Sequence, residues 1–101
     1  MQTDAFRVEI IANQSVQEEL AEAIEAADGP LFYTFLPAVQ GRGRQQKKLG
    51  NDTWPELNCI YILYTDARGL AALKEIVGDL KTRFPREGIK LFVVPTLPQE
   101  F

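Results

Sequence analysis

The apolar and polar positions along the chain alternate with the two-residue period of strands or recur with the spacing of helices. Together they predict the order strand, helix, strand, loop, strand, helix, strand. The segment 6–12, Phe-Arg-Val-Glu-Ile-Ile-Ala, begins with the alternation that is typical of a half-buried strand. Apolar residues then recur at helical spacing, at Val16, Leu20, Ile24 and Ala27. The two patterns predict a first strand followed by an amphipathic helix.

Polar and turn-forming residues mark both ends of this first helix. Ser15, followed three residues later by Glu18, matches a capping box, in which the two side chains satisfy free amide groups at the helix start. The triplet Asp28-Gly29-Pro30 predicts the helix end, because glycine accepts a left-handed conformation and proline cannot continue a helix.

The next two strands are predicted from aromatic and apolar runs. The first spans about 31–39 and is rich in aromatic residues, while Pro37 indicates a bulge or an edge position. The second, 57–64, is almost continuously apolar, which predicts burial on both faces or a place in the centre of the sheet. It contains Cys59, the single cysteine, which we expect to be a buried thiol rather than a disulfide partner.

A second amphipathic helix and a last strand complete the pattern. Asp66 is suited to cap the start of the helix, and Pro85 ends it. The segment 89–94 predicts a short strand, and the prolines that follow predict an irregular arm over 95–101.

Two strand-helix-strand units in tandem predict an α+β domain of the ferredoxin-like βαββαβ type, with a four-stranded antiparallel sheet and two helices on one face. Two helices can cover only one sheet face. Because the middle strands carry aromatic residues, we expect the other face to be buried by association between copies of the chain.

The composition fits a single domain over residues 1–101, with 46% hydrophobic and 25% charged residues. No apolar stretch approaches the roughly 18 residues that a membrane-spanning helix requires. The N-terminus also has no basic flank leading into an apolar core. We therefore expect a soluble, cytoplasmic protein without direct membrane insertion.

The run from Gln40 to Gly50 carries the candidate chemistry. It contains four of the 11 basic residues and no acidic residue: Arg42, Arg44, Lys47 and Lys48. Its glycines are unsuited to the interior of a helix or strand, and its cations repel one another unless an anion binds. The pattern predicts a mobile, basic, ligand-binding loop; the alternative is a solvated connector. Without these four cations the body has 7 basic and 14 acidic residues, which argues against general nucleic-acid binding.

Two short motifs resemble the nitrogen-regulatory PII superfamily. The segment 39–45, Val-Gln-Gly-Arg-Gly-Arg-Gln, is similar to the V-x-G-x-G-R-Q run that leaves the second strand and opens the family's T-loop. The segment 90–95, Lys-Leu-Phe-Val-Val-Pro, is similar to the family's K-I-F-V-I-P in the last strand. The order of elements and the length agree with this resemblance over nearly the whole chain.

The resemblance implies a homotrimer with nucleotide bound in clefts between subunits, and a T-loop-like segment, about 41–55, that inserts into a regulated transporter or enzyme. It implies that Gly41 and Gly43 let backbone amides approach phosphate, that Gln45 corresponds to a glutamine organising Mg²⁺ and 2-oxoglutarate, and that Lys90 is a cleft lysine. The expected ligand-binding residues are Gly41, Arg42, Gly43, Arg44, Gln45 and Lys90, and the alternative for Lys90 is a solubilising role at a strand edge. The expected partner-binding residues are Lys47, Lys48 and Trp54, and the alternative for Trp54 is packing at the base of the loop.

The chain also departs from the family pattern. The segment 82–90 keeps a single glycine where the family has T-G-x-x-G-D-G-K, and no arginine follows Lys90. No tyrosine lies between Gly41 and Trp54, so the family's uridylylation has no acceptor there. We therefore expect a divergent PII-like regulator, not an enzyme, that binds a small anionic ligand such as an adenine nucleotide.

Other functions of ferredoxin-like domains remain as alternatives. An acylphosphatase-like enzyme would carry glycines and an arginine after the first strand, where this chain has Ala12-Asn13-Gln14-Ser15, and the chain has no histidine for general base catalysis. A metal-binding module of the CutA type would depend on carboxylates. An RNA-binding module would combine the basic loop with sheet aromatics, against which the acidic body argues.

Overall fold

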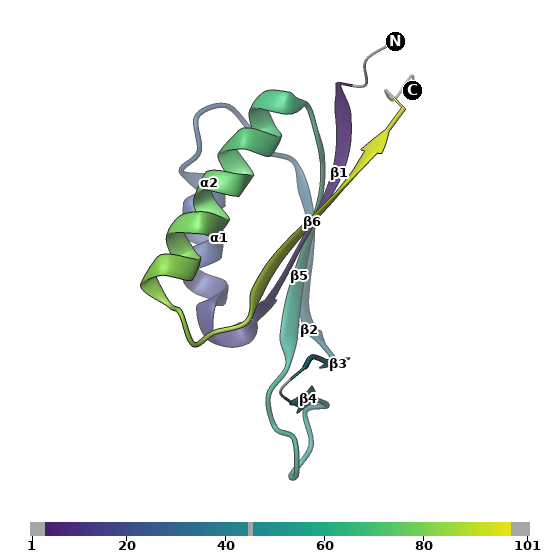
Figure 1. Cartoon of the computed structure of the whole chain (residues 1–101), viewed down its shortest axis with the longest axis vertical. Coiled ribbons are helices and arrows are strands. Elements are labelled where there is room, and N and C mark those ends of the chain that lie inside the picture. Colours follow the sequence, from purple (N-terminus) through teal and green to yellow (C-terminus); the bar gives the residue numbers. More distant parts are fainter. Residues whose placement is uncertain (1–3, 45, 98–101) are drawn as a thin grey trace.

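The computed structural model describes residues 4–44 and 46–97. Its main sheet contains the strands β1 (Ala5–Asn13), β2 (Tyr33–Val39), β5 (Asn58–Thr65) and β6 (Ile89–Thr96). Its helices are the short 3₁₀ helix η1 (Gln14–Val16) and the α-helices α1 (Gln17–Glu25) and α2 (Ala67–Arg83). A small hairpin of β3 (Gly41–Arg42) and β4 (Lys47–Lys48) projects from one end of the sheet (Figure 1).

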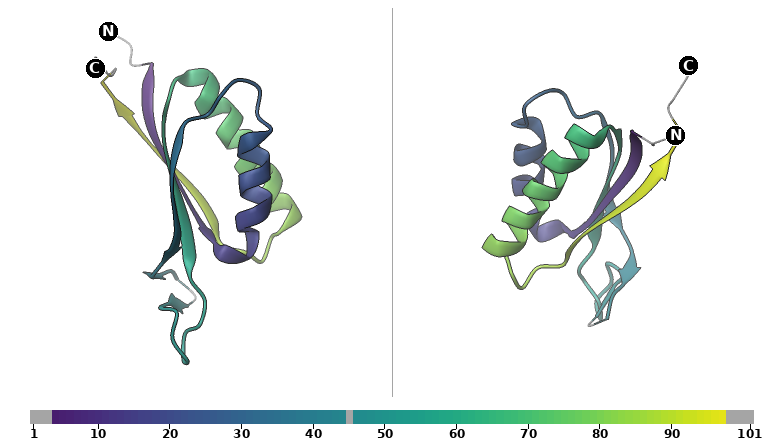
Figure 2. Two further views of the ribbon diagram at one scale, coloured as in Figure 1. Left: turned by 180° about the vertical axis from the view of Figure 1, so that it is seen from behind. Right: turned by 45° about the horizontal axis from the view of Figure 1, so that its top comes forward.

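The expected ferredoxin-like topology is confirmed. The strand order is β2-β5-β1-β6, and every neighbouring pair is antiparallel. Both helices lie on the same face of this sheet, and no other part of the described chain covers the opposite face (Figure 2). Neither α-helix in the described part is long and apolar enough to cross a membrane.

The hydrophobic core fills the space between the sheet and the helices. Alternate residues of the strands point into it, and the two helices contribute one face each. Its fully or almost fully buried members are Val8, Ile10, Ala12, Val16, Leu20, Ile24, Cys59, Tyr61, Leu63, Leu73, Val77, Leu80 and Ile89. Cys59 is therefore a buried thiol, as expected, and burial raises its pKa above the ordinary value.

The start of the first helix differs from the predicted capping box. The Asn13 side chain, not Ser15, accepts the hydrogen bond, from the Ser15 amide at 3.1 Å. The chain makes a 3₁₀ turn before α1, so that Val16 occupies the α1 N-cap position without a side-chain hydrogen bond. The predicted cap of the second helix is confirmed, since the Asp66 side chain accepts from the Gly69 amide at 2.9 Å.

Two boundaries, the end of the first helix and the end of the last strand, also differ from the predictions. The first helix ends at Glu25, before the predicted Ala27, and Gly29 then takes a left-handed conformation with φ of 77°. The last strand continues through Pro95 and Thr96, so the irregular arm does not begin at residue 95; residues 98–101 lie outside the described part. Proline is tolerated there because β6 is an edge strand that pairs only with β1.

The middle strands agree with the sequence patterns more closely. β2 is an edge strand, and its pairing with β5 shifts register between Leu36 and Val39, so Pro37 marks both an edge and a bulge. β5 lies between β2 and β1, which confirms the expected central position. Its residues alternate between fully and partly buried until Tyr64, so the helices cover only one of its faces.

The glycines of α2 give a matched test of the packing at the start of the helix. A Cβ on Gly69 would lie 1.7 Å from Thr65 Oγ1 and 2.9 Å from Thr65 Cβ, whereas a Cβ on Gly78 would meet nothing within 4 Å. We expect Gly69→Ala to lower the free energy of unfolding by about 1–3 kcal/mol. Gly78→Ala should raise it by about 0.5–1 kcal/mol, because alanine has the higher helix propensity.

Urea denaturation followed by circular dichroism measures both effects. A Gly69→Ala variant as stable as Gly78→Ala would show that Thr65 does not restrict this position.

Candidate functional site

The basic segment forms a hairpin at the end of the sheet where β2 stops and β5 begins. Gly41 pairs with Lys48 and Arg42 pairs with Lys47. The Gly43 amide closes the turn by donating to the Gln46 carbonyl at 3.1 Å. The predicted loop therefore contains regular pairing over two residues on each side, rather than irregular chain throughout.

The cations of this hairpin lie in two different environments. Arg42, Arg44 and Lys47 are exposed, and none of them forms an ion pair with another described residue. Like charges directly opposite each other, as at Arg42 and Lys47, destabilise a strand pair. Three unpaired cations on so short a hairpin therefore favour the binding of an anion.

Lys48 lies on the other face of the hairpin from Lys47, because successive side chains of a strand point to opposite sides. Its side chain is only 15% exposed, and its Nζ lies 3.8 Å from an Oε2 atom of Glu56. In this structure the Lys48 side chain contacts Glu56 of its own chain, and its contact with a partner protein stays a prediction.

Glu56 connects the hairpin to the main sheet. Its carboxylate accepts hydrogen bonds from Asn13 Nδ2 at 2.7 Å and from Gln46 Nε2. Asn13 is buried at the end of β1, and its backbone amide donates to the Gly88 carbonyl at 2.9 Å. Neither Glu56 nor Asn13 belongs to a sequence motif, so the sequence does not predict these contacts.

The hairpin glycines have different structural roles. A Cβ on Gly41 would lie 3.0 Å from Asn58 Nδ2, so the start of β5 restricts this position. A Cβ on Gly43 would meet only the Gln46 carbonyl oxygen at 3.9 Å, which is an ordinary contact. Close packing within the chain therefore accounts for Gly41, and the approach of backbone amides to phosphate stays a prediction.

The return of the segment is an ordered turn around Trp54. The Asn51 side chain accepts from the amides of Thr53 at 3.1 Å and Trp54 at 2.8 Å. The Trp54 carbonyl accepts from the amides of Leu49 and Asn51. Trp54 is half-buried, so it takes part in shaping the turn, and its contact with a partner stays a prediction.

Lys90 does not lie beside the hairpin within one chain. It is exposed near the start of β6 and pairs with Ile11 on β1. The order β2-β5-β1-β6 separates β6 from β2 by three strand spacings, roughly 14 Å. Lys90 and the hairpin therefore occupy opposite edges at the same end of the sheet. Gln45 lies outside the described residues.

Backbone groups of the turn before β6 form hydrogen bonds within the chain. The Glu87 amide donates to the Phe84 carbonyl, and the Gly88 carbonyl accepts from Asn13. This turn replaces the glycine-rich stretch of the PII pattern. Its Arg86 is exposed and adds positive charge near the start of β6.

The sheet face opposite the helices is mainly apolar. From the strand pairing, this open face consists of Arg7, Glu9, Ile11, Thr34, Leu36, Ile60, Ile62, Tyr64, Lys90, Phe92 and Val94. Tyr64, Phe92 and Val94 are each more than half exposed, at 58%, 51% and 55%. The expectation of an uncovered apolar face within the single chain is confirmed.

One charged pair lies on this open face. Arg7 Nε donates to Glu9 Oε2 at 2.9 Å, and Arg7 Nη1 donates to the Tyr64 hydroxyl at 2.6 Å. These hydrogen bonds raise the pKa of Arg7 above its ordinary value, with Glu9 the larger cause. The guanidinium also lies 5.6 Å from the centre of the Tyr64 ring. The charges of Arg7 and Glu9 thus neutralise each other within the chain, which lowers the desolvation penalty of burying this part of the open face.

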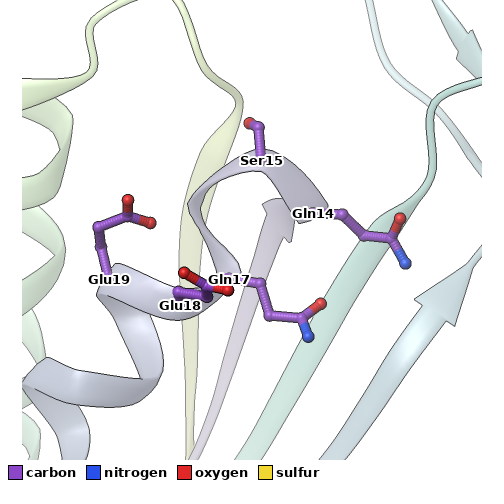
Figure 3. Close-up of a pocket in the computed structure, with 5 residues that line it drawn as sticks. All are labelled: Gln14, Ser15, Gln17, Glu18 and Glu19. Carbon is purple, nitrogen blue, oxygen red and sulfur yellow. The ribbon is translucent and has the colours of Figure 1, made fainter.

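A shallow depression at the start of α1 is a different kind of surface. It is lined by Gln14, Ser15, Gln17, Glu18 and Glu19, whose side chains are shown in Figure 3. Two carboxylates and no cation line it, so it does not suit an anionic ligand. The glutamates instead lie in the first turn of α1, where negative charge stabilises the helix dipole.

Comparison with known proteins identifies structural relatives. A nitrogen regulatory PII-like protein, CPII, from Thiomonas intermedia K12, in a structure bound to ADP, AMP and bicarbonate, superposes with a TM-score of 0.68 at 17% identity, covering 89% of this chain and 83% of CPII. A DUF3240 family protein from Shewanella baltica OS155 gives 0.65 at 14% identity, covering 100% and 98%. A candidate PII-like signalling protein from Thermus thermophilus gives 0.57 at 19%, covering 95% and 91%.

No protein-family model matches the sequence, and no curated protein sequence matches it significantly. At these identities the structural similarity establishes a shared fold. The chain therefore has the fold of PII-like proteins, in agreement with the two sequence motifs.

Proposed function

We propose that this chain is a PII-like regulatory protein without catalytic activity, which binds a small anionic ligand, such as an adenine nucleotide, and regulates a protein partner. The observation that carries the proposal is the cationic hairpin at the end of a PII-like sheet. Charge-assisted hydrogen bonds from Arg42 and Arg44 to a phosphate or carboxylate would relieve the repulsion between unpaired cations. The neighbouring CPII structure contains ADP, AMP and bicarbonate, which are ligands of this class.

A homotrimer would complete the ligand site. The open face is too apolar to remain in water, and its burial between three copies would stabilise the assembly by about 25 cal/mol per Å² of apolar area. The hairpin and Lys90 lie at opposite sheet edges within one chain. In a closed ring, Lys90 of one subunit can come close to the hairpin of the next. The ligand would then bind in the cleft between subunits.

The outer face of the hairpin would contact the regulated protein. Lys47 is exposed there, and Trp54 shapes the turn on which the hairpin stands. Ligand binding would shift the population of hairpin conformations and so change the surface offered to the partner, a transporter or an enzyme. The cations on this surface favour an acidic partner surface.

Ligand binding is testable by calorimetry with ATP, ADP, AMP, cyclic dinucleotides and bicarbonate. We expect binding of at least one of them, and we expect Arg42→Ala or Arg44→Ala to weaken it by about tenfold or more, the contribution of one charge-assisted hydrogen bond. Arg68→Ala is the matched control, because Arg68 is exposed at the start of α2, at the other end of the sheet. Absence of binding to all these compounds would exclude a nucleotide or bicarbonate sensor.

The assembly is testable by light scattering after gel filtration. We expect a mass three times the 11.4 kDa of one chain. Phe92→Glu should dissociate the trimer, because it places a charge in the buried apolar face. Phe32→Glu is the control: Phe32 is 75% exposed but precedes β2 and is not part of the open face. A monomeric wild-type chain would contradict this part of the proposal.

A further inference from the structure

The hairpin β3–β4 depends on few contacts. It has only two residue pairs, and in one of them two cations, Arg42 and Lys47, lie opposite each other. A two-stranded hairpin is marginally stable by itself in water, and like charges weaken it further. Its position against the sheet therefore requires contacts from outside the hairpin.

Glu56 provides these contacts. Among residues 4–44 and 46–97, the Glu56 carboxylate joins the hairpin to the main sheet. It accepts hydrogen bonds from Asn13 in the sheet and Gln46 in the hairpin, and it forms an ion pair with Lys48. One oxygen is bound by Asn13, which is anchored at the end of β1. The other oxygen receives Gln46 and lies near Lys48. The carboxylate is thus held by the sheet on one side and holds the hairpin on the other.

The Lys48 ammonium has a loose ionic contact. Its distance of 3.8 Å from Glu56 is longer than the roughly 2.8 Å of a charge-assisted hydrogen bond. Its side chain is only 15% exposed, and Glu56 is the one carboxylate in the described part of the chain with which it forms an ion pair. A better-placed external anion can therefore replace Glu56 as the partner of Lys48.

We propose that Glu56 is an internal counter-anion that docks the basic hairpin in the ligand-free protein and competes with the anionic ligand for Lys48. In this scheme, the bound anion takes the place of Glu56 beside Lys48 and so releases the hairpin from Asn13 and the sheet. A ligand shifts the equilibrium between the docked and the released hairpin only if it binds the two states with different affinities. In this scheme, the ion pair between Glu56 and Lys48 causes that difference in affinity. The inference rests on the proposed function for its ligand, but the docking of the hairpin is independent of it.

Docking is tested first, without ligand. Glu56→Gln removes the charge and keeps an amide oxygen that can accept from Asn13. Trypsin cleavage after Arg42, Arg44, Lys47 and Lys48 reports on the released hairpin, and the variant retains all four sites. We expect cleavage in this segment to be about three- to fivefold faster than in the wild type, as for the loss of one ion pair. Glu75→Gln, an exposed residue of α2, has the same change in net charge and should cleave like the wild type.

Competition is tested next, by titration with ADP. We expect Glu56→Gln to bind ADP about three- to fivefold more tightly than the wild type, because Lys48 no longer has an internal partner. The double variant Glu56→Gln with Lys48→Ala should lose this gain, while Glu75→Gln should show none.

The outcomes separate this inference from the proposed function. Unchanged cleavage in Glu56→Gln would overturn the docking role, whether or not ADP binds. Weaker ADP binding by Glu56→Gln, or a gain that persists without Lys48, would overturn the competition. Failure of the wild type and of all variants to bind ADP would count against the nucleotide function and the competition, while faster cleavage would still support docking by Glu56.

Discussion

A four-stranded sheet with two helices can cover only one of its faces, and the other properties of this protein follow from that limit. The strands direct alternate residues to the helices and to the open face. On the covered side, Val8, Ile10 and Leu63 are excluded from water. On the open side, Phe92 and Val94 remain more than half exposed. The uneven exposure of the two faces is the physical basis for the proposed association between copies of the chain.

The same topology collects the candidate chemistry at one end of the sheet. β1 and β2 end there, and β5 and β6 begin there, because all neighbouring strands are antiparallel. The hairpin, Asn13 and Gly88 are consequently close in space although they are distant in sequence. Lys90 is near this end too, but on the far edge. The proposed ligand site includes both edges and so requires more than one chain; in this proposal, association and ligand binding depend on the same architecture.

Local patterns were sufficient to predict the four strands of the main sheet, the two α-helices, their order and the open face, because periodicity is a local signal, but they did not predict η1 or the hairpin of β3 and β4. The Asp66 cap was predicted correctly, whereas the Asn13 side chain caps the 3₁₀ turn η1, and α1 then begins at Gln17 without a side-chain cap. β6 can continue through Pro95 because it is an edge strand that pairs only with β1. This position depends on the pairing of distant strands, which a local pattern does not show. Glu56 could not be predicted, since its Asn13 contact spans 43 residues and involves no motif.

The departures from the PII pattern change the physical basis of the ligand binding that we propose. The turn before β6 uses its backbone groups internally, at Glu87 and Gly88, and the closing amide of the hairpin, at Gly43, is also engaged. Fewer free amides remain to enclose a phosphate, so the attraction must come mainly from long cationic side chains, which are mobile and screened by salt. Such attraction is strong only when the charges lack other partners. In the proposed site, the proximity of Glu56 to Lys48 would therefore matter more than it would in a site built from backbone amides.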